Sequence, residues 1–154
     1  MFGNLDNDAM EEILLDGFVG RIGCHADDIT YVVPTSYAYH DSCIYCHTEE
    51  GMKTTMMRKN PKVCFEVDAM ENMANWKSVI SWGEYEEITD LPGQEKALNI
   101  LMDRKLPTYA SKTVKLTDEW PFHPTNPGDV GGVFFRIRLT EKTGRFETKD
   151  SIDN

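Results

Sequence analysis

Apolar and polar residues alternate along most of this chain, and this is the period of half-buried β-strands. The pattern predicts strands at 18–24, 29–40, 42–48, 63–67, 76–89 and 133–139. In the last of them Val133, Phe135 and Ile137 share one face, while Arg136 and Arg138 share the other. Short turns join the first three strands and predict an antiparallel meander. Six mostly antiparallel strands predict a small β-barrel with helices outside it.

Other segments follow the helical period, at 7–15, 51–59 and 91–106. In the first, Met10, Ile13 and Leu14 fall on one face, and Gly17 is placed to end the helix in the left-handed conformation. In the third, Pro92 fits the first turn.

The remaining segments predict irregular structure. Residues 68–75 are polar and predict a loop, and residues 141–154 predict a C-terminal tail. Residues 107–132 contain four prolines and predict a long loop. That loop is a candidate for a lid over a site or an arm onto a second subunit, and equally for a surface excursion.

The composition fits a single domain that spans residues 1–154. No stretch reaches the length of a membrane-spanning helix. The formal net charge of −10 disfavours nucleic acid and anionic membranes as partners, since both attract cationic proteins. The first residues are acidic, unlike those of a signal peptide, so a cytoplasmic location is expected. The cysteines at 24, 43, 46 and 64 are then expected to be reduced.

A candidate anion site lies at the start of the second predicted helix. Gly51 lets a ligand approach the backbone closely, and the first amides of a helix have no partner within it. Lys53 stands in that first turn, where the helix dipole disfavours a cation. An anion held between these amides and Lys53 would remove the conflict. The alternative is a solvated surface lysine.

Two residues mark irregular places in the predicted strands. Pro34 has no N–H to give to a ladder, so it indicates a sheet edge or a bulge. Gly83 indicates a bulge or the close approach of another group.

Residues 43–47 read C-I-Y-C-H, the pattern of covalent haem attachment. A strand would place Cys43 and Cys46 on opposite faces, and such attachment needs export to an oxidising compartment. The same geometry argues against a zinc site that adds Cys24 and His25. Neither metal interpretation is adopted, and no metal ion is expected.

Six sequence blocks occur in the order typical of one protein superfamily. They are G-F-V-G-R-I-G at 17–23, Y-V-V-P-T-S-Y-A-Y at 31–39, I-Y-C-H-T at 44–48, E-G-M-K at 50–53, N-P-K-V-C-F-E-V at 60–67 and S-V-I-S-W-G at 78–83. The chain thereby resembles the flavin-binding split-barrel proteins of the pyridoxamine-phosphate-oxidase-like superfamily. Within it, the chain is most similar to the branch that contains the 5-nitroimidazole-resistance proteins. It departs from that branch at Thr35-Ser36, Cys46 and Trp82.

The resemblance implies a mainly β, six-stranded antiparallel split barrel that binds FMN, with FAD as the second possibility. It also implies a homodimer with the flavin site at the interface. Gly51 and Lys53 would hold the phosphate, the backbone of 33–37 would border the flavin ring, and His47 would face the substrate as the catalytic residue. The expected cofactor-binding residues are Val33, Pro34, Thr35, Ser36, Tyr37, His47, Thr48, Gly51, Met52, Lys53, Ser78 and Ser81.

The function implied by the resemblance is that of a flavin-dependent oxidoreductase. It would reduce a small electrophile, such as a 5-nitroimidazole, another nitroaromatic or a quinone, with electrons from a reduced nicotinamide. No G-x-G-x-x-G fingerprint is present, so the nicotinamide would bind only transiently. The alternatives are a non-catalytic flavin carrier or redox sensor, a structural dimer, and a haem-binding split-barrel protein. The candidate axial ligands for haem are His25, His40, His47 and His123.

Overall fold

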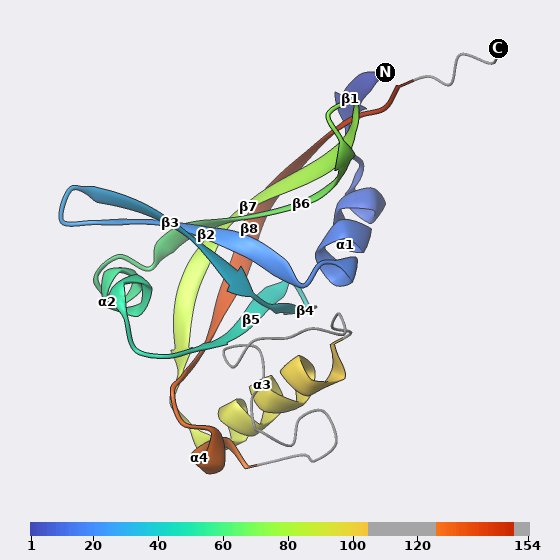
Figure 1. Ribbon diagram of the computed structural model, residues 1–154. Helices are drawn as coiled ribbons and strands as arrows, with labels where there is room; N and C mark the ends of the chain where they lie inside the picture. The colour runs from blue at the N-terminus through green and yellow to red at the C-terminus, as the bar shows by residue number, and fades with distance from the viewer. Residues whose placement is uncertain (105–125, 150–154) are drawn as a thin grey trace.

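The computed structural model describes residues 1–104 and 126–149 and arranges them as one antiparallel sheet with helices around it (Figure 1). The strands are β1 (Phe2–Asn4), β2 (Val19–Ala26), β3 (Ile29–Ser36), β4 (Ala38–His40), β5 (Cys43–Thr48), β6 (Lys62–Asn72), β7 (Asn75–Ile88) and β8 (Val133–Glu147). The helices are α1 (Asn7–Asp16), α2 (Met52–Lys59), α3 (Leu91–Asp103) and α4 (Pro127–Val130).

The two edges of this sheet are consecutive in the chain. The strands run in the order β3-β2-β6-β7-β8-β5-β4, with β1 paired to β8. Before Tyr37 the chain pairs with β2, and after it the chain pairs with β5. The sheet edges are therefore joined through the backbone at Tyr37, not by a ladder of hydrogen bonds. The prediction of a mainly β, antiparallel split barrel with peripheral helices is confirmed.

The strands are more numerous and longer than the sequence pattern predicts. The described residues form eight strands where six are predicted, and the segment 29–40 divides into β3 and β4 at Tyr37. β6 continues through most of the predicted loop to Asn72, and β8 continues through the first part of the predicted tail to Glu147. The far end of β6 is exposed on both faces. It carries no alternation, and its pairing with β7 decides its structure.

The predicted long loop is described only in part. Residues 107–125 lie outside the described residues, and 126–132 contain the short helix α4. The predicted helix at 91–106 is α3, and its last two predicted residues also lie outside the description. Within residues 1–104 and 126–149, no helix has the length and apolar character needed to cross a membrane.

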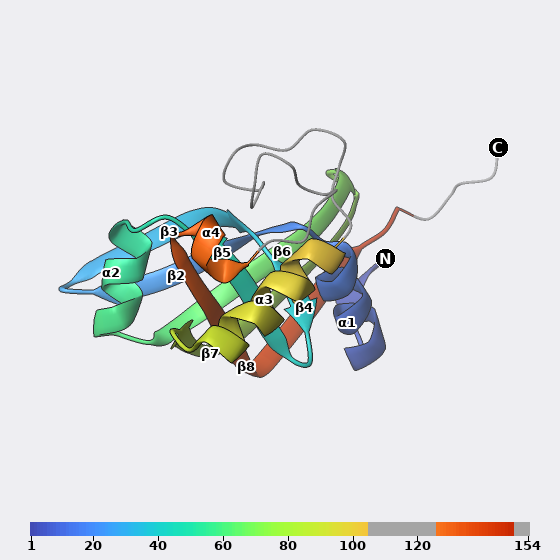
Figure 2. The same cartoon turned by 90° about the horizontal axis from the view of Figure 1, so that it is seen from below.

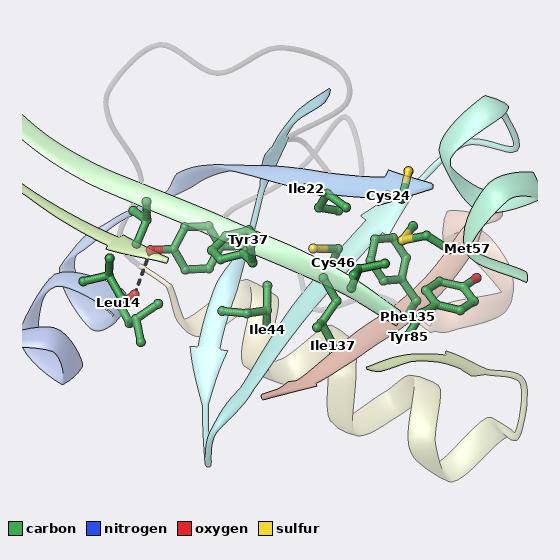
Figure 3. Close-up of a cluster of buried hydrophobic side chains, with 14 of the residues drawn as sticks. Leu14, Ile22, Cys24, Tyr37, Ile44, Cys46, Met57, Tyr85, Phe135 and Ile137 are labelled. Atoms are coloured by element: carbon green, nitrogen blue, oxygen red, sulfur yellow. Dashed lines mark hydrogen bonds between the residues drawn. The ribbon is translucent and has the colours of Figure 1, made fainter. Parts of the chain in front are cut away.

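β5 separates two apolar clusters and is buried on both faces. Ile44 and Cys46 point into the barrel core (Figure 3). Cys43 and Tyr45 point to the other side, where α3 lies across β4, β5 and β8 (Figure 2). Cys43 and Cys46 thus face opposite sides, as predicted. Among the described residues, no group of three or more His, Cys, Asp or Glu side chains is placed to hold a metal ion.

Both predicted irregular positions have a structural cause. β3 is an edge strand, so Pro34 removes no hydrogen bond from the interior of the sheet. At Gly83 the register between β7 and β8 shifts, and a Cβ would lie 2.4 Å from the carbonyl oxygen of Arg138. Of the predicted alternatives, the structure shows an edge at Pro34, and at Gly83 both the bulge and the close approach.

Tyr37 anchors α1 to the barrel. The predicted apolar face of α1, with Met10, Ile13 and Leu14, is buried. Tyr37 is fully buried, and its hydroxyl donates a hydrogen bond of 2.8 Å to the Leu14 carbonyl (Figure 3). Gly17 ends α1 in an extended conformation with a φ of −72°, so the predicted left-handed ending is wrong. Glycine is needed there because a Cβ would lie 2.3 Å from the Tyr37 hydroxyl oxygen.

We expect Tyr37→Phe to lower the free energy of unfolding by about 1–3 kcal/mol, because it removes the donor to a buried carbonyl. Urea denaturation followed by circular dichroism measures this change. Tyr31→Phe is the matched control, since the Tyr31 hydroxyl makes no hydrogen bond to a described residue. Equal losses in the two variants would contradict the anchoring role.

Candidate functional site

The ends of β3 and β5 and the first turn of α2 enclose a cavity of about 280 Å³. It lies in the split of the barrel, because the chain leaves β2 after Ser36 and pairs with β5 only from Ala38 onward. The two strand ends diverge there. The lining residues are Val19, Pro34, Thr35, Ser36, His47, Thr48 and Lys53. Six of these seven belong to the set predicted from the sequence.

The first turn of α2 brings Lys53 to the cavity. Gly51 is the N-cap, and its amide donates to the hydroxyl oxygen of Thr54 at 3.1 Å. The same Thr54 hydroxyl lies 2.9 Å from the Gly51 carbonyl and is fully buried. These bonds fix the start of the helix. The amides of Met52 and Lys53 then have no partner within the helix and none among the described residues.

Arg58, in the last turn of α2, ties that helix to the sheet. Its guanidinium donates to both carboxylate oxygens of Glu50, at 2.7 and 2.8 Å, and to Glu87 of β7 at 3.1 Å. These hydrogen bonds raise the pKa of Arg58, and the Arg58 guanidinium holds the pKa of the Glu50 carboxyl below its usual range. Both carboxylates are paired with a cation, and neither lines the cavity.

The cavity differs in charge from its surroundings. Its described lining carries one lysine and no carboxylate, although the chain has a net charge of −10. A larger cavity of about 590 Å³, between α1 and the far end of the β6–β7 hairpin, has five carboxylates and one lysine, Lys77, in its described lining. A third, of about 280 Å³ beside α3, has three carboxylates, Glu86, Glu87 and Asp90, and two cations, Lys96 and Arg136. The cavity in the split is the better match for an anion.

His47 lies at the rim of the cavity on the side of α4. Its Nε2 is 2.8 Å from the carbonyl oxygen of Gly131, which follows α4 directly. Its ring lies 4.9 Å from the Phe134 ring, measured between centroids, and Phe134 is its register partner on β8. The imidazole is therefore held at two sides while it borders the cavity.

The wall behind the cavity contains a thiol. Thr35 lines the cavity, and its side chain is hydrogen-bonded to Cys46, which lies in the barrel core. Complete burial raises the pKa of the Cys46 thiol to about 12, although the hydrogen bond to Thr35 lowers it. Burial likewise raises the pKa of Cys24 and Cys43. These thiols stay protonated near neutral pH, and a protonated thiol is a poor nucleophile.

Four predicted binding residues, Val33, Tyr37, Gly51 and Met52, are not part of the cavity lining. Val33 is half-buried and pairs with Ile22, and the side chain of Tyr37 points into the core (Figure 3). Met52 is exposed, and a Cβ on Gly51 would meet nothing within 4 Å. For residues 33–37 and Gly51 the predicted contacts with the cofactor are made by backbone groups. The positions of the side chains do not test those contacts.

The two predicted serines of β7 do not line the cavity within one chain. The Ser78 hydroxyl donates to Glu66 at 3.2 Å. Ser81 is fully buried, and its hydroxyl has no hydrogen-bond partner in the part of the chain that the structure describes. Their role in cofactor binding stays a prediction.

The structure adds residues that the sequence did not single out as part of the site. Val19 lines the cavity because β2 places it opposite Ser36. Gly131 and Gly132 approach His47 from a segment predicted only as loop. The register of β2 with β3 would have identified Val19, but nothing in the sequence pairs residue 131 with residue 47.

One family model and several known proteins are similar to this chain. The family model described as pyridoxamine 5'-phosphate oxidase matches residues 6–146. An FAD-binding protein of Mesorhizobium loti is 30% identical in sequence, with a TM-score of 0.73 over 96% of this chain and 99% of that chain. A proposed 5-nitroimidazole antibiotic resistance protein of Bacteroides thetaiotaomicron is 20% identical, with a TM-score of 0.72 over 95% of this chain and 87% of that chain. An uncharacterized protein of Rhizobium meliloti is 27% identical over 92% of each chain.

We expect Thr54→Val to lower the free energy of unfolding by about 1 kcal/mol, because it removes the hydrogen bonds that cap α2. Thermal denaturation of the purified protein measures this loss. Thr55→Val is the control, since the exposed Thr55 hydroxyl bonds only the Gly51 carbonyl, at 3.1 Å, and leaves the Gly51 amide capped. A loss in the control as large as in Thr54→Val would show that Thr54 has no special part in fixing the helix start.

Proposed function

Because the chain belongs to the pyridoxamine 5'-phosphate oxidase family, we propose that it binds a flavin nucleotide in the split of its barrel and acts as an oxidoreductase. The proposed cofactor is FMN. The proposed reaction is the reduction of a small electrophile, a nitroaromatic or a quinone, with electrons from a reduced nicotinamide. The similar Mesorhizobium loti protein is an FAD-binding protein, so FAD is the second candidate.

One observation carries this proposal. Residues from three separate segments, at 34–36, 47–48 and 53, meet in a cavity with one lysine and no carboxylate in its described lining. A nucleotide phosphate is an anion and can pair with this lysine. The unpaired amides at the start of α2 can donate hydrogen bonds to the same phosphate. Hydroxyl groups of Thr35, Ser36 and Thr48 can serve the polar groups of the rest of the nucleotide.

The chain's own residues then have distinct tasks. Lys53 and the amides of Met52 and Lys53 would bind the phosphate, and Arg58 would keep that turn in place through Glu50 and Glu87. The backbone of 33–37 would offer hydrogen bonds to the ring, and His47 would contact the flavin on the side that faces the substrate. A bound flavin supplies the electron-transfer chemistry, which no side chain of the described residues provides.

The size of the cavity supports a second copy of the chain as partner. Pockets that bury a drug-sized ligand usually measure about 300–1,000 Å³, so about 280 Å³ is small for a flavin nucleotide. We propose that the chain forms a homodimer in which the partner subunit completes the cavity.

A sheet-face patch, defined as Val19, Val32, Cys64, Ile80 and Trp82, supports the same partner. Val32, Gly23, Cys64 and Trp82 lie in one row across β3, β2, β6 and β7. Val32 is 65% exposed and Trp82 is 42% exposed. Val19 belongs both to the patch and to the cavity lining, so a second copy on this face would also reach the cavity.

We expect Lys53→Ala to raise the dissociation constant for FMN about 10- to 100-fold, because a charge-assisted contact to phosphate is lost. Lys59→Ala is the matched control: it removes the same charge from the same helix, but Lys59 pairs with Asp27 away from the cavity. Flavin fluorescence titration measures both constants, and the released chromophore distinguishes FMN from FAD. A wild-type protein that binds neither flavin would refute the proposal.

We expect Trp82→Glu to shift the protein from dimer to monomer, because it places a charge within the apolar sheet-face patch. Sedimentation equilibrium measures the molar mass. Met73→Glu is the control, since Met73 is 85% exposed in the β6–β7 turn and lies outside the patch. A monomeric wild-type protein, or a dimeric Trp82→Glu variant, would contradict this interface.

Turnover separates the enzyme from a flavin carrier. We expect the reduced, flavin-loaded protein to be reoxidised by a nitroaromatic or quinone in stoichiometric amount under anaerobic conditions, as followed by the flavin absorption band. A protein that binds flavin and is not reoxidised by either class would be a carrier or redox sensor.

A further inference from the structure

We propose that the Gly131-Gly132 turn fixes His47 in the tautomer with the proton on Nε2, which leaves Nδ1 as a hydrogen-bond acceptor for a ligand of the cavity that His47 lines. The tautomer is independent of the proposed function. The identity of the group that Nδ1 accepts from rests on that function, because it assumes a flavin in the cavity.

His47 makes a direct hydrogen bond to Gly131. A carbonyl oxygen can only accept a hydrogen bond, so the 2.8 Å contact requires a proton on Nε2. In a neutral imidazole the other ring nitrogen then carries a lone pair. No described residue donates to Nδ1 of His47.

The shape of the turn depends on both of its glycines. Gly131 has a φ of 68° and a ψ of −166°, a region that only glycine adopts without strain. Gly132 has a φ of 71°, and a Cβ there would lie 2.8 Å from Nε2 of His47 and 2.7 Å from the carbonyl oxygen of Thr48. Two glycines are therefore needed for the carbonyl of residue 131 to reach the ring.

The turn leads directly into β8. Only Val133 separates Gly132 from Phe134, which packs on the His47 ring and pairs with His47 in the β5–β8 ladder. The Gly131 carbonyl, just before β8, and the His47 imidazole, on β5, are thus positioned by the pairing of β5 with β8. This arrangement positions the ring without any help from a ligand.

The consequence concerns which ligands the cavity selects. Lys53 and the amides of α2 offer donors, while Nδ1 of His47 offers an acceptor that stays in place. The complementary ligand has an anionic group at one end and an N–H or O–H group at the other. Gly131 and Gly132 act as positioning residues, because they touch His47 and do not line the cavity.

Nuclear magnetic resonance of the ring nitrogens of His47 tests the tautomer in the flavin-free protein. We expect the Nε2–H form to dominate in the wild type and in the control Gly128→Ala, where a Cβ meets nothing within 4 Å. In Gly132→Ala we expect a mixture of tautomers. A wild-type ring protonated on Nδ1, or a Gly132→Ala spectrum identical to that of the wild type, would overturn the proposal.

Two substitutions of His47 test the acceptor without altering the turn. His47→Gln retains a donor near the position of Nε2 and has no acceptor at the position of Nδ1, whereas His47→Asn retains an amide oxygen near the position of Nδ1. We expect His47→Gln to weaken FMN binding about 5-fold, the loss of one hydrogen bond, and His47→Asn to bind more tightly than His47→Gln. Equal affinities or the reverse order would overturn the acceptor role. A wild type that binds no FMN would instead refute the proposed function and leave the tautomer result standing.

Discussion

The change of pairing partner at Tyr37 is the constraint on which the rest of this structure depends. β3 pairs with β2 at one edge of the sheet, and β4 pairs with β5 at the other. The backbone therefore changes its hydrogen-bonding partner within a single residue. Backbone polar groups in a protein interior need partners, and a break of this kind is stable only where the chain is held by other contacts. The Tyr37 amide donates to Phe18, and its side chain fills the core and holds α1. The gap that remains between β3 and β5 is the candidate site.

The site has an electrostatic character opposite to that of the molecule. The Glu50 and Glu87 carboxylates are paired with Arg58, and Lys53 is the one charged group that lines the described cavity. The same arrangement places a cation at the start of α2, against the helix dipole. An anion bound between Lys53 and the first amides of α2 would offset this unfavourable interaction. The buried, protonated Cys46 behind the wall adds no charge to it.

Sequence reasoning succeeded where a local pattern carried the information. The buried face of α1, the edge at Pro34 and the bulge at Gly83 follow from period and residue chemistry. Six residues that the resemblance implies for cofactor binding, Pro34–Ser36, His47, Thr48 and Lys53, line one cavity, and their binding role stays a prediction. It failed where a distant partner decides the structure. The exposed end of β6 is a strand only because β7 lies beside it, and Gly17 is needed because Tyr37 approaches it. Gly131 reaches His47 across 84 positions of sequence, a contact that no short motif encodes.

The pairing of β8 has a consequence for how this chain folds. β8 lies between β7 and β5 and also pairs with β1, so the ladders that unite the two halves of the sheet need a strand that follows all the other described strands in the chain. Contacts so distant in sequence are entropically expensive to form and slow to find. Until they form, β7 and β5 each expose an open edge that can pair with another chain. A partly folded chain in which β8 has not yet paired is therefore prone to aggregate. A chaperone, or a mutation that speeds folding, would lower this risk by favouring the early pairing of β8 with β7 and β5.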